Sequence, residues 1–210
     1  EPQFKKAKYV LESYVYIKPW QLEIKHLWKS FMLDSGAFTL MQQKKKGVKN
    51  DINWREFAVE YSEFINKHEI DLFFELDLDH VIGLKETEKL RKIIELRTGK
   101  QPIPVFHKGT RDKEYFKAMT KDYPYVAIGG LVGKIIAQKG FKYLPWFTDT
   151  AHENGAKIHG LGFTPMNILD YNFDSVDSTS WLGCKFGNIY SLNNEGGITT
   201  HSAPKGKRTV

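Results

Sequence analysis

The sequence predicts an α/β protein built as a compact (β/α)8 barrel. Short runs rich in β-branched and aromatic residues alternate with amphipathic stretches of helical period, and eight such runs can be counted. Alternation of this kind favours parallel strands joined by right-handed helical crossovers, and eight strands suffice to close a barrel. The 210 residues can bury a full core but lie near the lower size limit of a barrel, so an open doubly wound sheet is the alternative. The chain begins at Glu1 without a methionine, which leaves room for an element before it.

The expected strands are defined by their apolar runs and by the glycine or polar residues that follow them. The eighth run has the weakest pattern. The strands are expected over residues 8–17, 31–33, 70–76, 103–106, 125–128, 157–161, 173–176 and 186–192.

Four helices are expected between these strands. Asn53 followed by Glu56 forms a capping-box pattern, and an apolar face at helical spacing follows it from Trp54 to Ile65. Two further helices are expected over residues 85–97 and 112–121, and a fourth ends at Gly155 with Pro145 near its start.

Composition excludes several classes of protein. With 41% hydrophobic and 27% charged residues, most of the chain is not disordered. No stretch approaches the roughly 20 apolar residues of a membrane span, and residues 1–8 are too charged for a secretion signal, so a cytoplasmic protein without membrane contact is expected. Cys184, the single cysteine, can form neither an internal disulfide nor a cysteine-rich zinc site. We expect one domain over residues 1–195 and a weakly ordered basic tail over 196–210.

Charge is unevenly distributed along the chain. Residues 1–50 carry ten basic and four acidic side chains, whereas 51–84 carry two basic and nine acidic ones. Lys44, Lys45, Lys46 and Lys49 form a dense basic run that would suit a phosphate backbone. Charge alone favours a solvated surface over nucleic-acid binding, because lysine clusters are common on soluble proteins. Nothing in the sequence indicates the oligomeric state.

Chemically capable residues follow six of the expected strands. In a barrel these positions converge at the carboxyl-terminal mouth, where carboxylates can act as nucleophile, base or ligand. Each taken alone has a structural explanation as a helix cap or a turn residue, but the series is poorly explained by turn chemistry. The residues are Asp34, Asp77, Asp79, His107, Gly129, Gly130, His159, Gly160 and Asp177.

Four of these segments resemble motifs of the tRNA-guanine transglycosylase superfamily. Residues 33–38 (LDSGAF) are similar to its D-S-G-G-[FY] segment, and 127–133 (AIGGLVG) to its I-G-G-L-x-V-G segment. Residues 159–162 (HGLG) resemble M-G-V-G, and 173–177 (FDSVD) stand where the family has D-x-F-D. The short length resembles the phage-type branch, which inserts 7-deazaguanines into DNA. The resemblance implies a (β/α)8 barrel that exchanges guanine for a 7-deazaguanine.

The resemblance also implies roles for single residues. Asp177 would be the nucleophile that attacks C1′ and forms a covalent glycosyl-enzyme, and Asp34 would shuttle the proton. Asp77 and the backbone at Gly130 and Leu131 would read the edge of the purine. Phe38 and His159 would stack on its two faces, while His107 takes the place of a family glutamine. Gly129 and Gly160 would let the base approach the backbone.

Two departures from the family pattern bear on the substrate. The tRNA-acting members carry a cysteine-histidine zinc site that Cys184 alone cannot build, so neither zinc nor another cofactor is expected. Residues 178–181 (STSW) replace the proline-threonine-arginine that usually follows the nucleophile. Both departures favour DNA over tRNA as the nucleic-acid partner, with a free 7-deazaguanine such as preQ0 as the second substrate.

Two other functions remain open on the sequence. A metal-dependent barrel hydrolase could use oxygen and nitrogen ligands from the strand ends. A noncatalytic nucleic-acid-binding barrel would need only the basic segments. The metal ligands would be Asp77, Asp79, His107, His159 and Asp177.

Overall fold

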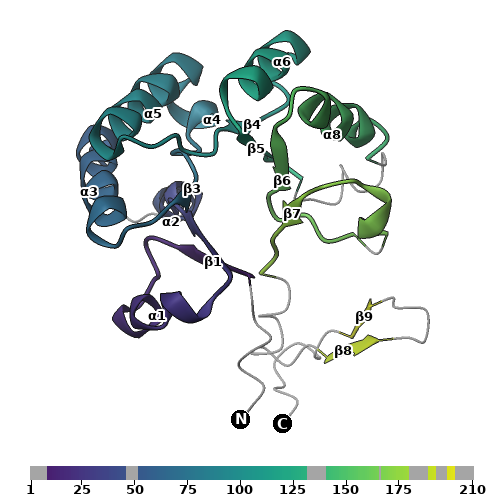
Figure 1. Cartoon of the computed structure of the whole chain (residues 1–210), viewed down its shortest axis with the longest axis horizontal. Helices are drawn as coiled ribbons and strands as arrows, with labels where there is room; N and C mark the ends of the chain where they lie inside the picture. Colours follow the sequence, from purple (N-terminus) through teal and green to yellow (C-terminus); the bar gives the residue numbers. More distant parts are fainter. Residues whose placement is uncertain are drawn as a thin grey trace.

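Seven parallel strands follow one another around the molecule in chain order (Figure 1). The computed structural model describes residues 9–45, 52–131, 141–165, 167–179, 189–192 and 198–201. A three-stranded sheet has the order β1-β2-β3 and a four-stranded sheet the order β4-β5-β6-β7, and a parallel bridge between Phe74 and Ile103 links the two. The strands are β1 (Tyr9–Ser13), β2 (Ser30–Asp34), β3 (Leu72–Phe73), β4 (Val105–Phe106), β5 (Tyr125–Ile128), β6 (Lys157–Gly160) and β7 (Ser175–Val176).

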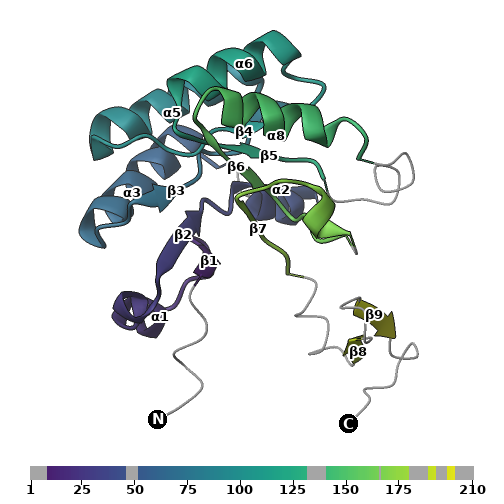
Figure 2. The same cartoon turned by 45° about the vertical axis from the view of Figure 1, so that its right-hand side comes forward.

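The four longest helices lie on the outside of these strands (Figures 1 and 2). The α/β architecture with parallel strands is therefore confirmed. Short 3-10 turns occur at Lys25–Leu27 and Ile168–Asp170. The helices are α1 (Pro19–Glu23), α2 (Ala37–Lys45), α3 (Trp54–Lys67), α4 (Asp79–Ile82), α5 (Leu84–Thr98), α6 (Lys113–Asp122) and α8 (Leu144–Glu153).

All four predicted helices are present. The Asn53 side chain accepts a hydrogen bond from the Glu56 N–H at 3.3 Å, as a helix cap does, and α3 begins at the next residue. Pro145 lies in the first turn of α8, where its missing N–H has no intrahelical partner to lose. Among the described residues, no helix has the length and apolarity needed to cross a bilayer.

The expected eighth strand of the barrel is wrong. In the run 186–192, Ile189–Leu192 form β8, which pairs antiparallel with β9 (Ile198–His201) and with no parallel strand. Five residues between them are enough for an antiparallel hairpin, whereas a parallel partner would need a long crossover. β9 also lies in the segment 196–210, whose weak order stays a prediction. In the described ranges β7 pairs only with β6 and β1 only with β2, and closure of the barrel stays a prediction.

Several other strands are shorter than predicted, and the difference is largest for β1 and β3. β1 stops at Ser13, because the Ser13 carbonyl accepts turn hydrogen bonds from the N–H groups of Tyr16 and Ile17. The run 70–76 yields only β3 and the bridge at Phe74. At and just after the end of this run, the side chains of Glu75 and Asp77 form ion pairs.

Side chains alternate between the two faces of the strands, as strand geometry requires. Leu33 and Phe73 face outward into the core formed with α3 and α5, whereas Met32 and Phe74 face the interior. His159 belongs to the interior set, since its ring packs against Phe74 at 5.1 Å between centroids. The interior core also contains Ile103, Val105 and Ala127.

Candidate active site

Three aspartates follow the carboxyl ends of parallel strands and influence one another electrostatically. Asp34 is the last residue of β2, Asp77 follows β3, and Asp177 directly follows β7. The negative charges of Asp77 and Asp177 both act on the carboxyl group of Asp34. The structure thus brings together the predicted nucleophile, the predicted proton shuttle and the predicted purine-binding carboxylate.

Asp34 has the most strongly perturbed carboxyl group of this mouth. Burial, opposed by a hydrogen bond from the Gly36 N–H and reinforced by the charges of Asp77 and Asp177, raises its pKa from 3.8 to about 6. The Gly36 nitrogen lies 3.2 Å from Asp34 Oδ2. Gly36 has a φ of 72°, and a Cβ there would lie 2.6 Å from Val15, so only glycine fits this turn. A carboxyl group of this pKa can both give and take a proton near neutral pH.

Asp177 is held in place through its Oδ1 atom. The Gly162 N–H donates a hydrogen bond to it at 2.8 Å, and Nε2 of His159 lies 3.2 Å away. The carboxylate itself keeps about a fifth of its surface exposed. It is therefore both fixed in orientation and reachable from the mouth, as a nucleophile must be.

His159 supports Asp177 and is not placed to stack on a base. It is 1% exposed, and one face of its ring packs against Phe74. Its Nδ1 is hydrogen-bonded to Ser175 Oγ, which in turn lies 2.6 Å from the Tyr125 hydroxyl. The expectation that His159 sandwiches the purine is therefore not supported, because both ring nitrogens and one face are already occupied inside the molecule.

Asp77 is paired with His107, the residue that directly follows β4. Oδ1 of Asp77 lies 2.7 Å from Nε2 of His107, although this nitrogen is not aligned for a regular hydrogen bond. Burial lowers the pKa of His107, but Asp77 and the charge of Asp79 outweigh it and raise the pKa above its ordinary value. A Cβ at Gly129 would lie 2.5 Å from the His107 ring, so glycine at this position makes room for the imidazole.

A pocket of about 390 Å³ opens beside His107. Gly129, Gly130 and Leu131, predicted to read the edge of a base, line it, and Gly130 is exposed with a φ of 70°. Phe38 lies at the start of α2 and is 58% exposed, which leaves its ring free to meet a ligand. The other lining residues are His80, Phe106, His107, Lys108, Ile128, Tyr143 and Phe147.

Gly160 contributes backbone rather than an opening to the pocket. Its carbonyl accepts a hydrogen bond from the Asp177 N–H at 3.4 Å, and a Cβ would lie 3.0 Å from Phe163. Gly160 thus allows the end of β6 to pack closely against the segment that carries the candidate nucleophile.

A buried ionic network under the pocket was not predicted from the sequence. Glu75 is fully buried and lies 3.0 Å from Arg111 and 3.3 Å from Arg91. Arg111 also lies 3.3 Å from Asp79, whose carboxylate accepts a hydrogen bond from Thr110 at 2.6 Å. Asp79, considered from the sequence as a ligand or a cap, is therefore part of this network.

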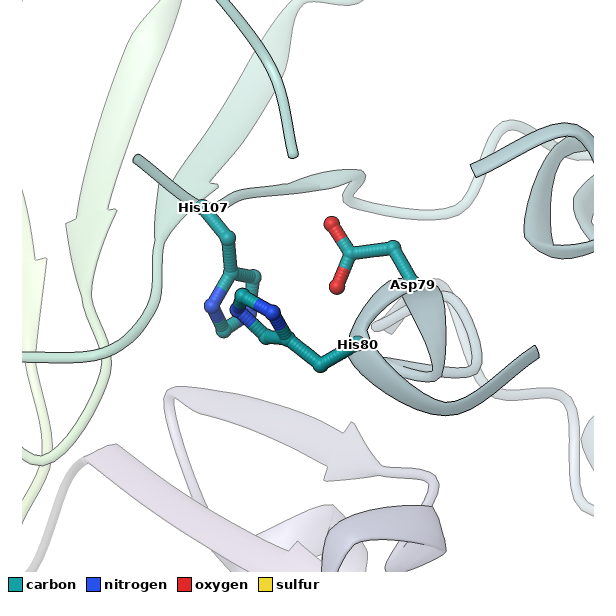
Figure 3. Close-up of side chains that lie close together, drawn as sticks. All are labelled: Asp79, His80 and His107. Atoms are coloured by element: carbon teal, nitrogen blue, oxygen red, sulfur yellow. The ribbon is translucent and has the colours of Figure 1, made fainter. Parts of the chain in front are cut away.

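His80 is a second residue that sequence reasoning missed. It follows Asp79 in the chain, and its ring lies 4.7 Å from that of His107 in an edge-to-face contact. Figure 3 shows Asp79, His80 and His107 close together, and His80 and His107 line the pocket. The sequence signal that could have identified His80 is its position directly after the strand-end aspartates Asp77 and Asp79. The proposed ligand set is not assembled as a whole, since His159 pairs with Asp177 instead of facing Asp79.

Part of the sequence prediction falls outside the described residues. Lys46, Lys49 and Cys184 lie there, as do residues 132–133 and 180–181 of the motif segments.

Comparison with known proteins identifies no family for the chain. No family model matches it, and no curated protein sequence matches it. Among solved structures, the carboxyl transferase domain of pyruvate carboxylase from Rhizobium etli, determined with pyruvate, superposes with a TM-score of 0.47 at 14% identity. The match covers 81% of this chain and 33% of that one, so the chain spans about a third of the length of this neighbour. A likeness this weak says nothing about activity.

Proposed function

We propose that the protein is a base-exchange transglycosylase that replaces guanine in nucleic acid, DNA in preference to tRNA, with a 7-deazaguanine such as preQ0. The observation that carries the proposal is the electrostatic coupling of Asp34 to Asp177 and Asp77, with the Asp34 pKa raised to about 6. Base exchange needs one ionised carboxylate to attack and one carboxyl group that gives and takes a proton, and separate environments for two acids supply that difference.

Asp177 acts as the nucleophile in this proposal. Its carboxylate attacks C1′ of the target nucleotide as the bond to guanine breaks, which forms a covalent glycosyl-enzyme. The Gly162 N–H and His159 hold the attacking group at a fixed angle. Fixed placement matters because a well-oriented nucleophile removes much of the entropic cost of the reaction.

Asp34 moves the proton. Protonated Asp34 donates to the departing guanine, and the resulting carboxylate accepts a proton from the incoming 7-deazaguanine as C1′ is released from Asp177. A pKa of about 6 suits both halves of this cycle near neutral pH. Asp77 and the backbone of Gly129, Gly130 and Leu131 bind the purine edge beside it, and Phe38 stacks on an exposed face.

The fold that this activity requires is a closed (β/α)8 barrel. The chain order of the seven parallel strands found in the described residues and the outer helices support that inference. No metal or organic cofactor enters the proposed reaction, since the transferred group passes only between two bases and one carboxylate.

The proposal is tested by incubating the protein with duplex DNA and, separately, with tRNA in the presence of labelled guanine or preQ0. Label should enter DNA, and a covalent protein–DNA adduct should be visible on a denaturing gel. Asp177→Asn should lower exchange by at least about 10³-fold and abolish the adduct, because loss of a nucleophile removes the whole covalent route.

Asp170→Asn provides the matched control. Asp170 lies on the same segment but is exposed, with Asn167 as its hydrogen-bond partner, and the variant should retain full activity. Full exchange by Asp177→Asn would disprove the nucleophile assignment. Salt-sensitive binding without exchange would favour a noncatalytic barrel, and chelator-sensitive hydrolysis would favour a hydrolase.

A further inference from the structure

We infer that Asp79, His80 and His107 form a binding site for a divalent transition-metal ion at the side of the pocket. One ligand atom from each residue lies within 4.8 Å of the other two (Figure 3). Asp79 and His80 begin helix α4, and His107 directly follows β4, so two neighbouring strand ends bring the three together. Two imidazoles and one carboxylate are a donor set that zinc, manganese, iron and cobalt accept.

The buried carboxylate of Asp79 has one oxygen without a partner. Asp79 is 4% exposed, and its Oδ2 is engaged by Thr110 and Arg111. Its Oδ1 is buried and has no hydrogen-bond partner in the described part of the molecule. Buried oxygens in this state are rare and cost about 1–3 kcal/mol, so a missing partner such as an ion is the expected explanation.

Charge around Asp79 leaves an excess of negative groups. Glu75, Glu88 and Asp79 share two guanidinium groups, those of Arg91 and Arg111. The Arg111 Nε atom is close to Asp79 but not aligned for a hydrogen bond, so this pair leaves the carboxylate incompletely neutralised. A bound cation would supply the remaining positive charge.

Asp77 completes the site from behind His107. Metal-binding histidines commonly have a carboxylate on the ring, which fixes the orientation of the imidazole. Asp77 lies 2.7 Å from His107 Nε2 and would serve this purpose.

The inferred metal site is open toward the pocket. His80 is exposed and lines the pocket together with His107. Three protein ligands leave at least one coordination position free, which is typical of sites that also bind a water molecule or an incoming ligand. A metal ion here takes no part in the proposed base exchange, so the inference does not depend on the proposed function.

The test is a titration of the tag-free, chelator-dialysed full chain with Co²⁺ in the absence of nucleic acid. Visible absorption bands of Co²⁺ should appear and saturate at one equivalent, and Zn²⁺ should displace them. His80→Gln should weaken Co²⁺ affinity by at least about tenfold, because even the loss of a supporting residue has that effect. Asp79→Asn, which keeps an oxygen for Thr110, should weaken it similarly.

His152→Gln is the control. His152 pairs with Asp174 at 3.0 Å and also contacts the Asn172 side chain at 3.4 Å, so it tests whether any histidine beside an aspartate would give the signal. Absence of a stoichiometric Co²⁺ complex, or equal affinity of His80→Gln and the unaltered protein, would overturn the inference. Since the titration measures binding alone, its outcome is separate from that of the base-exchange assay.

Discussion

Two groups of carboxylates, one around fully buried Glu75 and one around partly buried Asp34, have different electrostatic surroundings. Glu75 has two arginines within 3.3 Å and a hydrogen bond from the Val105 N–H at 2.7 Å. Among the described residues, Asp34 has no ion-pair partner, and its nearest charged neighbours are the aspartates Asp77 and Asp177. Cations thus surround the Glu75 carboxylate, whereas other carboxylates surround Asp34.

The difference indicates which carboxylates stabilise the fold and which take part in the reaction. Burial of a carboxylate is unfavourable in both places and raises both pKa values, but two arginines oppose it at Glu75, whereas at Asp34 only backbone N–H groups do. An uncompensated acid of this kind is unfavourable for stability and is typical of functional sites. The Glu75 network should therefore be needed for folding, and the Asp34 group for activity.

The largest expected effect on stability is in the Glu75 network, where arginines pair with the carboxylates. Arg111→Met leaves Glu75 and Asp79 without their shared cation and should lower the free energy of unfolding by about 3–5 kcal/mol, as measured by urea denaturation. Lys89→Met breaks an exposed pair with Glu86 and should change it by less than about 1 kcal/mol. Equal losses in the two variants would remove the distinction between the carboxylate groups.

Asp34→Asn should raise the free energy of unfolding instead of lowering it. The pKa of Asp34 is raised in the folded state, so the folded protein holds this proton more tightly than the unfolded chain, and stability falls as pH rises from about 4 to about 6. Asparagine removes that loss. At pH 8 the variant should be more stable than the unaltered protein by about 1–3 kcal/mol, with the gap closing below pH 4. It should also lose base exchange.

Urea denaturation at pH 8 and pH 4 measures the effect. A gap that does not depend on pH would show that the Asp34 carboxyl group is not responsible for it. A variant less stable at pH 8 than the unaltered protein would place Asp34 with the supporting carboxylates instead.

The smallest effect concerns the chain of hydrogen bonds behind Asp177. Tyr125→Phe removes the hydroxyl that contacts Ser175 and should lower the free energy of unfolding by about 0.5–1.5 kcal/mol. It should also lower kcat for exchange with little change in KM, because Ser175 orients His159. Tyr123→Phe removes a similar bond to Glu95 at 2.6 Å away from the mouth and should affect stability alone. Equal kcat values for the two variants would contradict the positioning role.

Local sequence patterns predicted much of the fold. The bounds of β5 agree with the apolar run at 125–128, and α3 begins after its predicted cap at Asn53. These features depend on residues close together in the chain, where propensity and capping are decisive. α2 was missed because its residues 37–45 lack a clear apolar face. β8 was assigned to the barrel because an apolar run does not reveal which strand it pairs with.

The site could be predicted only in part. Asp34, Asp77 and Asp177 come together because strand ends share one edge of a parallel sheet, and this rule needs no structure. The role of His159 could not be predicted, since it depends on Ser175 and Tyr125 from two other strands. The same holds for Glu75, which is acidic in sequence but compensated by arginines from a helix and a loop.

The first and last strands of the parallel series, β1 and β7, also affect how the protein can be handled. In the described ranges each of the two strands pairs along one edge only, and a strand edge without a partner is a template for pairing with another chain. Shortened versions that end after residue 179 or begin after residue 8 would present these edges without whatever the flanking segments contribute. Such versions are expected to aggregate, and studies of the candidate active site should therefore use the full 210 residues.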